Sequence, residues 1–156
     1  MQNSIVILNI FPFIIAMVAG ALVPFQAGSN AALGKAIGHP LWATMLSLLI
    51  SIVLTLIVIV FLKLTKPEIS TLSNVPYWAW AGGIIGVIYI TSALMLTPRL
   101  GATSFIVCVI AGQLIASLVI DSFGLVGLAA KEINPARILG VTCVFIGSLI
   151  VSWSNR

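Results

Sequence analysis

The chain has 156 residues, of which 61% are hydrophobic and only 6% are charged. Soluble domains carry roughly 25% charged residues, so seven basic and three acidic side chains are too few to cover a soluble protein of this size. The net charge of +4 comes from Lys and Arg beside apolar runs, where basic residues anchor helices at lipid headgroups, and this pattern argues against nucleic acid as a partner.

The charged residues divide the sequence into long uncharged runs. A bilayer core about 30 Å thick needs about 20 apolar residues at helical rise, and the runs match that length. We therefore predict an all-α polytopic membrane protein, a single transmembrane domain over residues 1–156 with five helices in the lipid bilayer. The predicted spans are 5–35, 41–62, 77–97, 102–120 and 135–153.

The first span is predicted as a long helix that is kinked at Pro24, because helix-forming residues follow that proline. The alternative is an aqueous loop over residues 26–40. If the helix continues, Gln26 and Asn30 share a face, and polar amides at membrane depth need another helix or a wet cavity. If the segment is a loop, both amides are ordinary solvated groups.

The third span begins with an aromatic cluster at the membrane interface and is predicted to end at Thr97, before a proline. One stripe at helical spacing carries Trp78, Gly82, Gly86, Tyr89 and Ala93, and the first four are candidate site residues. The two glycines either let another helix approach closely or leave room for a ligand beside the aromatic side chains. The sequence alone leaves both interpretations open.

The fourth span carries Gln113 near its middle and Asp121 at its end. A glutamine at mid-membrane depth either lines a cavity or forms an interhelical hydrogen bond. Asp121 is interpreted as a helix end at the interface or an ion pair with Arg137, and a role in ion or proton coupling is the alternative. The link to the third span is so short that these two helices must be antiparallel neighbours.

The fifth span starts at Asn134-Pro135, a cap residue followed by a proline suited to the first helical position.

No cluster of His, Cys and carboxylate residues, phosphate-binding loop or catalytic triad spacing occurs in the sequence. We therefore expect no enzyme activity, no catalytic residues, no cofactor and no metal site. The middle of every predicted span also lacks charged residues. A cavity built from the polar residues of these spans would be uncharged, which suits neutral or zwitterionic solutes or a cation held by aromatic faces.

Basic residues are almost balanced between the two sides of the membrane. One side would carry Lys63, Lys66, Lys131 and Arg137, and the other Lys35, Arg99 and Arg156, a ratio of four to three. The side of the membrane with more Lys and Arg usually faces the cytoplasm, so a difference of one residue barely determines the orientation of the chain. The chain either has one orientation set by other details or inserts in both orientations and forms an antiparallel homodimer of about ten helices.

Four segments carry a family resemblance: "GALVPFQAGSNAALGKAIGHPLWATMLSLLI", "YWAWAGGIIGVIYITSALMLTPRLGATSF", "AGQLIASLVIDSFGLVG" and "ILGVTCVFIGSLIV". Together they resemble the short, five-helix bacterial branch of the drug/metabolite transporter superfamily, a sibling of the EamA-domain and small multidrug resistance families. The resemblance implies a half-transporter in the bacterial inner membrane, with alternating access between two inverted halves. It also implies that helices one, three and four line a central cavity.

Carried over onto this sequence, the resemblance places Gln26, Asn30, Gly82, Gly86, Tyr89 and Gln113 in the cavity lining. It makes Pro98, Arg99, Gly101 and Asp121 turn and interface residues. We expect a secondary transporter of small organic metabolites or drugs that acts as a dual-topology antiparallel homodimer. The alternatives are one half of a heterodimeric transporter and a non-transporting membrane subunit that binds a partner protein.

Overall fold

The computed structural model describes residues 2–154, with side chains described from residue 10 onward. The described chain is all-α and contains five helices that are long and apolar enough to cross a membrane. These helices are α1 (Gln2–Ile37), α2 (Pro40–Phe61), α3 (Ala81–Leu100), α4 (Ala102–Phe123) and α5 (Pro135–Ser154). Short 3-10 helices lie at Ile69–Asn74, Tyr77–Trp80 and Leu125–Gly127. The protein is a five-span membrane protein.

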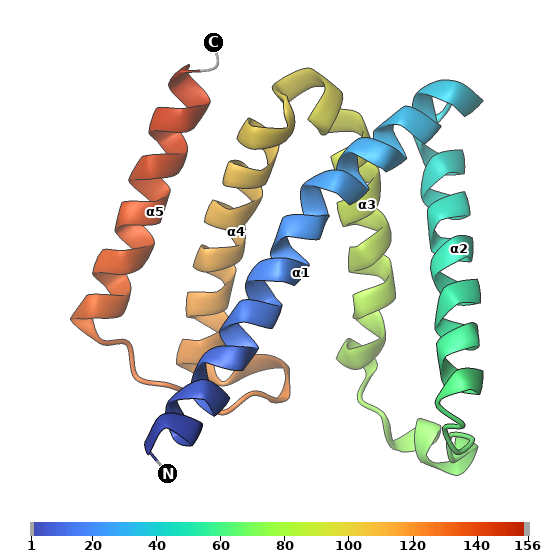
Figure 1. Cartoon of the computed structure of the whole chain (residues 1–156), viewed down its shortest axis with the longest axis horizontal. Helices are drawn as coiled ribbons and strands as arrows, with labels where there is room; N and C mark the ends of the chain where they lie inside the picture. The colour runs from blue at the N-terminus through green and yellow to red at the C-terminus, as the bar shows by residue number, and fades with distance from the viewer. Residues whose placement is uncertain (1, 155–156) are drawn as a thin grey trace.

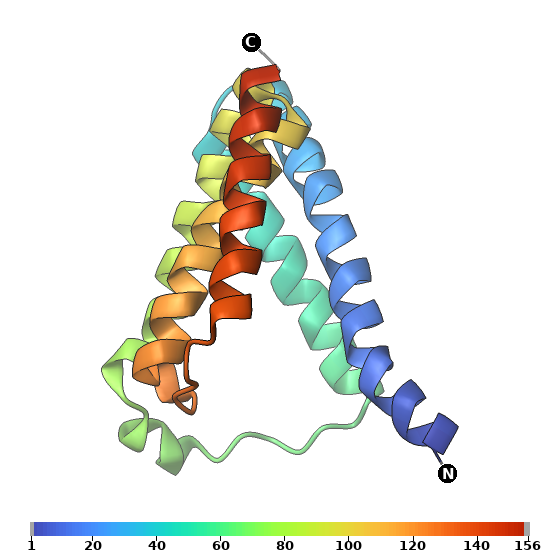
Figure 2. The same ribbon diagram turned by 90° about the vertical axis from the view of Figure 1, so that its left-hand side faces the viewer.

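The five helices connect at two opposite ends of the molecule (Figure 1). The turn end carries the α1–α2 turn, the α3–α4 turn and the C-terminal end of α5. The loop end carries the N-terminal end of α1 and the connections over residues 62–80 and 124–134. Helices α1 and α2 lie close to the other helices at the turn end and spread from them toward the loop end (Figure 2).

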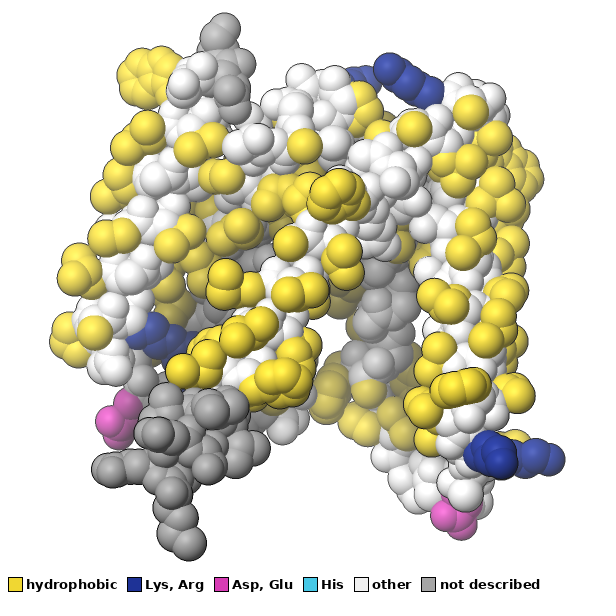
Figure 3. Space-filling model, in the orientation of Figure 1, with side chains coloured by type: hydrophobic (Ala, Val, Ile, Leu, Met, Phe, Trp, Pro, Cys, Tyr) yellow, Lys and Arg dark blue, Asp and Glu magenta, His cyan; other side chains and the backbone are white. Residues whose placement is uncertain are grey.

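Most large apolar side chains are exposed in the single chain, and hydrophobic groups extend along the helices over the face shown in Figure 3. Such a surface suits lipid or another membrane helix rather than water. The buried hydrophobic residues are mostly small, namely Ala27, Ala43, Ala93, Leu94, Phe105 and Ala111. Small residues allow membrane helices to approach closely, and van der Waals packing then replaces the hydrophobic effect as the force that associates them.

Helix α1 passes through Pro24 and continues to Ile37, so the residues that the sequence left between helix and loop are helical. Gly38 ends α1 with a φ of +85°, a conformation that glycine adopts without steric cost. His39 then caps α2, because its Nδ1 accepts a hydrogen bond from the Leu41 N–H at 3.2 Å. Pro40 occupies the first turn of α2, where its missing N–H has no intrahelical partner to lose.

The third candidate membrane span begins at Tyr77, where the sequence predicted it, but helix α3 does not end at the predicted residue. It continues through Pro98 to Leu100 instead of ending at Thr97, and Gly101, with a φ of +80°, ends it. A proline this close to a helix end costs one backbone hydrogen bond and leaves little helix to disrupt. At the other end, Trp78 lies in a 3-10 turn that precedes α3. A 3-10 turn has about 3.0 residues per turn, so Trp78 does not follow the helical spacing of the residues after it.

Helices α4 and α5 end and begin at residues with clear local roles. Gly124 closes α4 in the left-handed conformation, with φ +61° and ψ +38°, which is the usual glycine cap. The Asn134 side chain accepts a hydrogen bond from the Arg137 N–H at 2.8 Å and caps α5 ahead of Pro135. These two caps define the end of α4 and the start of α5, and the last turn of α4 lies beside the first turn of α5.

Candidate functional site

Helices α1, α3 and α4 meet around a small apolar cluster. Ala27 of α1, Ala93 of α3 and Phe105 of α4 are each 4% exposed and contact one another. Partly buried Tyr89, Ile106 and Val109 pack against this cluster. Because two of its three central residues are alanines, α1 can cross close to α3 at this depth.

A narrow cleft lies beside this cluster, between α1 and α3. It has about 200 Å³ of empty space and is lined by Val23, Gln26, Ala27, Asn30, Tyr89, Ile90 and Ala93. In the single chain, its accessible part holds about one water molecule. The cleft brings three of the predicted site residues together: Gln26, Asn30 and Tyr89.

Asn30 is the most unusual side chain of the cleft. Only 9% of the residue is exposed, its amide has no hydrogen-bond partner within residues 10–154, and the amide atoms themselves are not fully buried. An amide offers two donor hydrogens and an acceptor oxygen, so these atoms are available to hydrogen-bond another molecule. Gln26 lies one helical turn earlier, is exposed, and lines the same cleft. Both amides can therefore turn polar atoms to a molecule that enters the cleft.

The other predicted cavity residues do not line this cleft. Gln113 is exposed on α4, one turn after Val109, which packs at the edge of the apolar cluster. Gly82 and Gly86 have no atoms of another helix within 4 Å of the position that a Cβ would take. Within the described chain, the two glycines therefore do not serve as a close helix–helix contact.

Trp78 lies toward the loop end and is separated in sequence from the cleft by the first turns of α3. Its ring atoms come within 3.5 Å of the position that a Cβ on Gly127 would occupy, beyond the end of α4. This aromatic side chain therefore packs against the α4–α5 connection. It is absent from the residues that line the cleft.

Asp121 pairs with Arg137, which donates a hydrogen bond to the Asp121 carboxylate and ties the end of α4 to the start of α5. The two side chains are 19% and 31% exposed, respectively. The Asp121 carbonyl also accepts the Lys131 N–H at 2.7 Å, which holds the α4–α5 connection against the helix end. Of the two interfacial roles considered for Asp121, the structure contains the ion pair.

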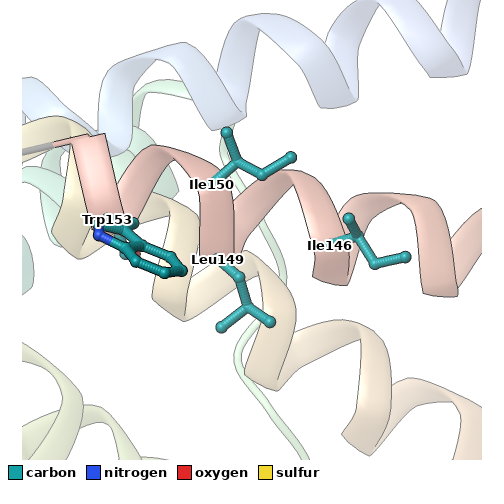
Figure 4. A pocket seen from close by; sticks show the side chains of 5 residues that line it. Ile146, Leu149, Ile150 and Trp153 are labelled. Atoms are coloured by element: carbon teal, nitrogen blue, oxygen red, sulfur yellow. The ribbon is translucent and has the colours of Figure 1, made fainter.

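Two further features lie outside the cleft. The thiol of Cys108 on α4 lies 3.6 Å from the Ser152 hydroxyl on α5, and neither Cys108 nor Cys143 forms a disulfide. Figure 4 shows a shallow groove on α5, lined by Ile146, Leu149, Ile150, Ser152 and Trp153. Its walls are almost entirely apolar, so the groove has nothing to orient a polar solute.

Sequence reasoning missed the apolar half of the cleft. Val23 and Ala27 on α1, with Ile90 and Ala93 on α3, form its remaining walls. The spacing of Val23, Ala27 and Asn30 is that of one helix face and was available in the sequence. On α1 only the amides Gln26 and Asn30 stand out from an apolar sequence, and polarity does not identify the small residues that let two helices enclose a space.

No curated protein and no solved structure matches the chain. A family model described as "Putative inner membrane exporter, YdcZ", of the drug/metabolite transporters, matches residues 11–150, which is most of the sequence. This match confirms the resemblance inferred from the four segments, and membership of a transporter family means that the protein is not an enzyme. The chain belongs to the YdcZ family of inner membrane exporters, a branch of the drug/metabolite transporters.

Proposed function

We propose that the protein exports small neutral or zwitterionic organic solutes across the inner membrane, and that Gln26, Asn30 and Tyr89 bind the solute. The observation that carries this proposal is the Asn30 amide, which lines the cleft on an almost buried residue and has no hydrogen-bond partner among the described residues. A bound solute with hydroxyl, amide or carbonyl groups would supply the missing hydrogen bonds. We propose export and not import because the family is described as inner membrane exporters.

The chemistry of the cleft favours uncharged solutes. Its polar side chains are two amides and a phenol, and its other walls are aliphatic. A net anion would find no cation there, and a net cation would find no carboxylate, although the Tyr89 ring can hold a positive group on its face. Compounds that combine an apolar body with a few hydrogen-bonding groups match this lining.

We further propose that two copies in opposite orientations form the complete transporter. The cleft of one chain is too small for an organic solute, and Gln113, Gly82 and Gly86 all face open space in the single chain. A second, inverted copy packed on this face would cover the exposed residues and enlarge the enclosed space. Rocking of one half against the other would then expose the site on alternate sides.

Asp121 has a structural role in this proposal. It is the one acidic residue of the sequence that falls within a long helix, since Glu68 and Glu132 belong to the connections. Its carboxylate is bound to Arg137 and does not line the cleft. We therefore assign it to holding α4 against α5, with proton coupling as the alternative.

The test begins with a ligand-stabilisation screen of the purified protein, followed by flux measurements in liposomes with the solutes that stabilise it. Asn30→Leu should lower flux about 5- to 150-fold, because losing the hydrogen bonds between the amide and the solute costs roughly 1–3 kcal/mol. Thr55→Val is the matched control, because Thr55 is exposed on α2 and its hydroxyl bonds to the Ser51 carbonyl of its own helix. This control should transport like the unmodified protein.

Equal flux by Asn30→Leu and the unmodified protein would remove Asn30 from the binding site. A protein that moves no solute of a broad panel, yet copurifies with one stoichiometric partner, would instead be a membrane subunit without transport activity of its own. Isolation as a complex with a homologous chain of opposite charge bias would favour the heterodimer over the homodimer.

A further inference from the structure

A second cavity lies at the turn end, apart from the solute cleft. It has about 740 Å³ of open space and is formed where α1 ends, α2 begins and α3 ends. It is lined by Ala31, Gly34, Lys35, Gly38, Pro40, Leu94, Met95, Pro98 and Arg99. Two of these residues, Lys35 and Arg99, carry a positive charge, whereas no charged side chain lines the cleft around Asn30.

The positive charge at this cavity has no acidic side chain to balance it. The three acidic residues of the sequence are Asp121, at the last turn of α4, and Glu68 and Glu132, in the loop-end connections. On the face shown in Figure 3, acidic groups accordingly occur only toward that end. The one salt bridge among the described residues joins Arg137 to Asp121, so neither Lys35 nor Arg99 has an acidic partner there.

The two ends of the described chain differ in net charge. The loop end carries four basic and three acidic residues, a net charge of +1, and the turn end carries Lys35 and Arg99, a net charge of +2 within residues 2–154. The turn end therefore holds most of the excess positive charge although it holds fewer basic residues.

Helix dipoles do not remove this excess. Lys35 and Arg99 each lie in the last turn of a helix, where a cation is stabilised by the negative end of the dipole. However, α2 and α4 begin at the same end and bring two positive dipole ends. The partial charges of α1 through α4 thus nearly cancel, and the two side chains remain as an unbalanced pair on a shared cavity.

We propose that this cavity binds a phosphate group, with Lys35 and Arg99 as its cationic contacts and a membrane phospholipid as its source. Arg and Lys are the residues that bind phosphate most effectively, and the turn end lies at headgroup depth if the helices span the bilayer. Leu94, Met95 and Pro98 supply an apolar wall for the glycerol and upper acyl region of the same molecule. This site is independent of solute transport through the cleft.

The test uses the full-length protein in detergent and measures lipid adducts by native mass spectrometry together with the melting temperature. The probes are phosphatidylglycerol, phosphatidylcholine, glycerol phosphate and inorganic phosphate. Each basic residue near a membrane surface contributes about 1 kcal/mol to binding an anionic lipid. Lys35→Gln with Arg99→Gln should therefore raise the phosphatidylglycerol concentration for half-maximal binding about 30-fold, which corresponds to ~2 kcal/mol.

Two control variants separate a defined site from general attraction. Lys63→Gln with Lys66→Gln removes the same charge from the loop end and should leave phosphatidylglycerol binding within about 3-fold of the unmodified protein, because neither lysine lines the cavity. Lys35→Arg with Arg99→Lys retains both charges at the cavity and should also retain binding. This second variant shows that any loss follows from charge and not from misfolding.

Equal losses in the two charge-removing variants, or no loss in either, would overturn the proposal. If glycerol phosphate or inorganic phosphate raises the melting temperature of the unmodified protein but not that of Lys35→Gln with Arg99→Gln, the phosphate site stands and its source is soluble. Binding of phosphatidylcholine as tight as that of phosphatidylglycerol, unaffected by removing Lys35 and Arg99, would show that neither cation contacts the lipid and would contradict the proposal.

Discussion

The side-chain hydroxyls of Thr44 on α2 and Thr91 on α3 lie 3.0 Å apart and form a hydrogen bond between two membrane helices. Thr44 is 2% exposed, and its hydroxyl also lies 3.2 Å from the Pro40 carbonyl. A hydroxyl has one hydrogen to donate, so Thr44 donates to Pro40 and accepts the Thr91 hydrogen in the arrangement that satisfies both contacts. This pair fixes α2 against α3 near the turn end.

Replacing either threonine by valine should lower the free energy of unfolding. Interhelical hydrogen bonds in membrane proteins contribute about 0.6 kcal/mol on average and about 1.7 kcal/mol at most. We expect Thr44→Val and Thr91→Val each to destabilise the protein within this range, and the double variant to destabilise it by less than the sum. A double-mutant cycle of unfolding in mixed micelles measures the coupling, and strictly additive effects would show that the two hydroxyls do not interact.

Gly34 has little room for a branched side chain. A Cβ at this position would lie 3.1 Å from the Leu94 Cδ2 atom and 3.6 Å from the Ala43 Cβ, because α1, α2 and α3 meet there. Gly34→Val should therefore destabilise the protein by roughly 1–3 kcal/mol through overpacking. Gly28→Ala is the control, since nothing lies within 4 Å of its Cβ position, and it should be neutral or slightly stabilising in thermal unfolding.

If Gly34→Val melts at the same temperature as the unmodified protein, the three helices are not in close contact at this point. If Gly28→Ala instead prevents dimer formation while the single chain stays folded, the open space at Gly28 is filled by a second copy. The two variants therefore separate packing within the chain from packing between chains.

Asp121→Asn should lower the melting temperature because it breaks the ion pair that joins α4 to α5. The exchanged pair, Asp121→Arg with Arg137→Asp, should recover part of the loss, because opposite charges again face each other. Solute flux by Asp121→Asn should persist at a temperature where the variant is folded. Loss of flux driven by a pH gradient, with unchanged stability, would assign Asp121 to proton coupling instead.

The balanced distribution of Lys and Arg predicts that the chain inserts in both orientations. With Cys108 and Cys143 replaced by serine, a cysteine at position 66 lies in the loop-end connection and reports which side of the membrane that end faces. A membrane-impermeant thiol reagent should label about half of the chains in intact cells, as expected for two orientations. Labelling of all chains or of none would exclude a dual-topology homodimer.

The number and approximate place of the helices could be predicted because the seven basic and three acidic residues mark the ends of long apolar runs. The site was harder to predict from the sequence, because Asn30 and Gln113 are both amides in apolar helices and the sequence does not distinguish them. In the structure Asn30 is buried and Gln113 is exposed, because α1 crosses α3 where Ala27 and Ala93 leave room. This crossing depends on contacts between distant segments, which local spacing does not encode.

Local deviations from regular helix geometry account for the remaining differences. Trp78 left the predicted stripe because a 3-10 turn changes the angle per residue before α3 begins. Pro98 did not end α3, because the loss of one backbone hydrogen bond near a terminus is tolerated. Both effects are short-range, but each depends on how the adjoining turn packs.

Protection of a cysteine at position 26 by the solute tests whether the cleft beside Asn30 binds the exported solute. In a protein without Cys108 and Cys143, Gln26→Cys should react with a small maleimide. Labelling should slow about 10-fold when the solute is present at about ten times its dissociation constant. A cysteine at Ser73, which is exposed in the connection between α2 and α3, should react at the same rate with and without solute. Unchanged labelling at position 26 while the same preparation still transports the solute would contradict the account.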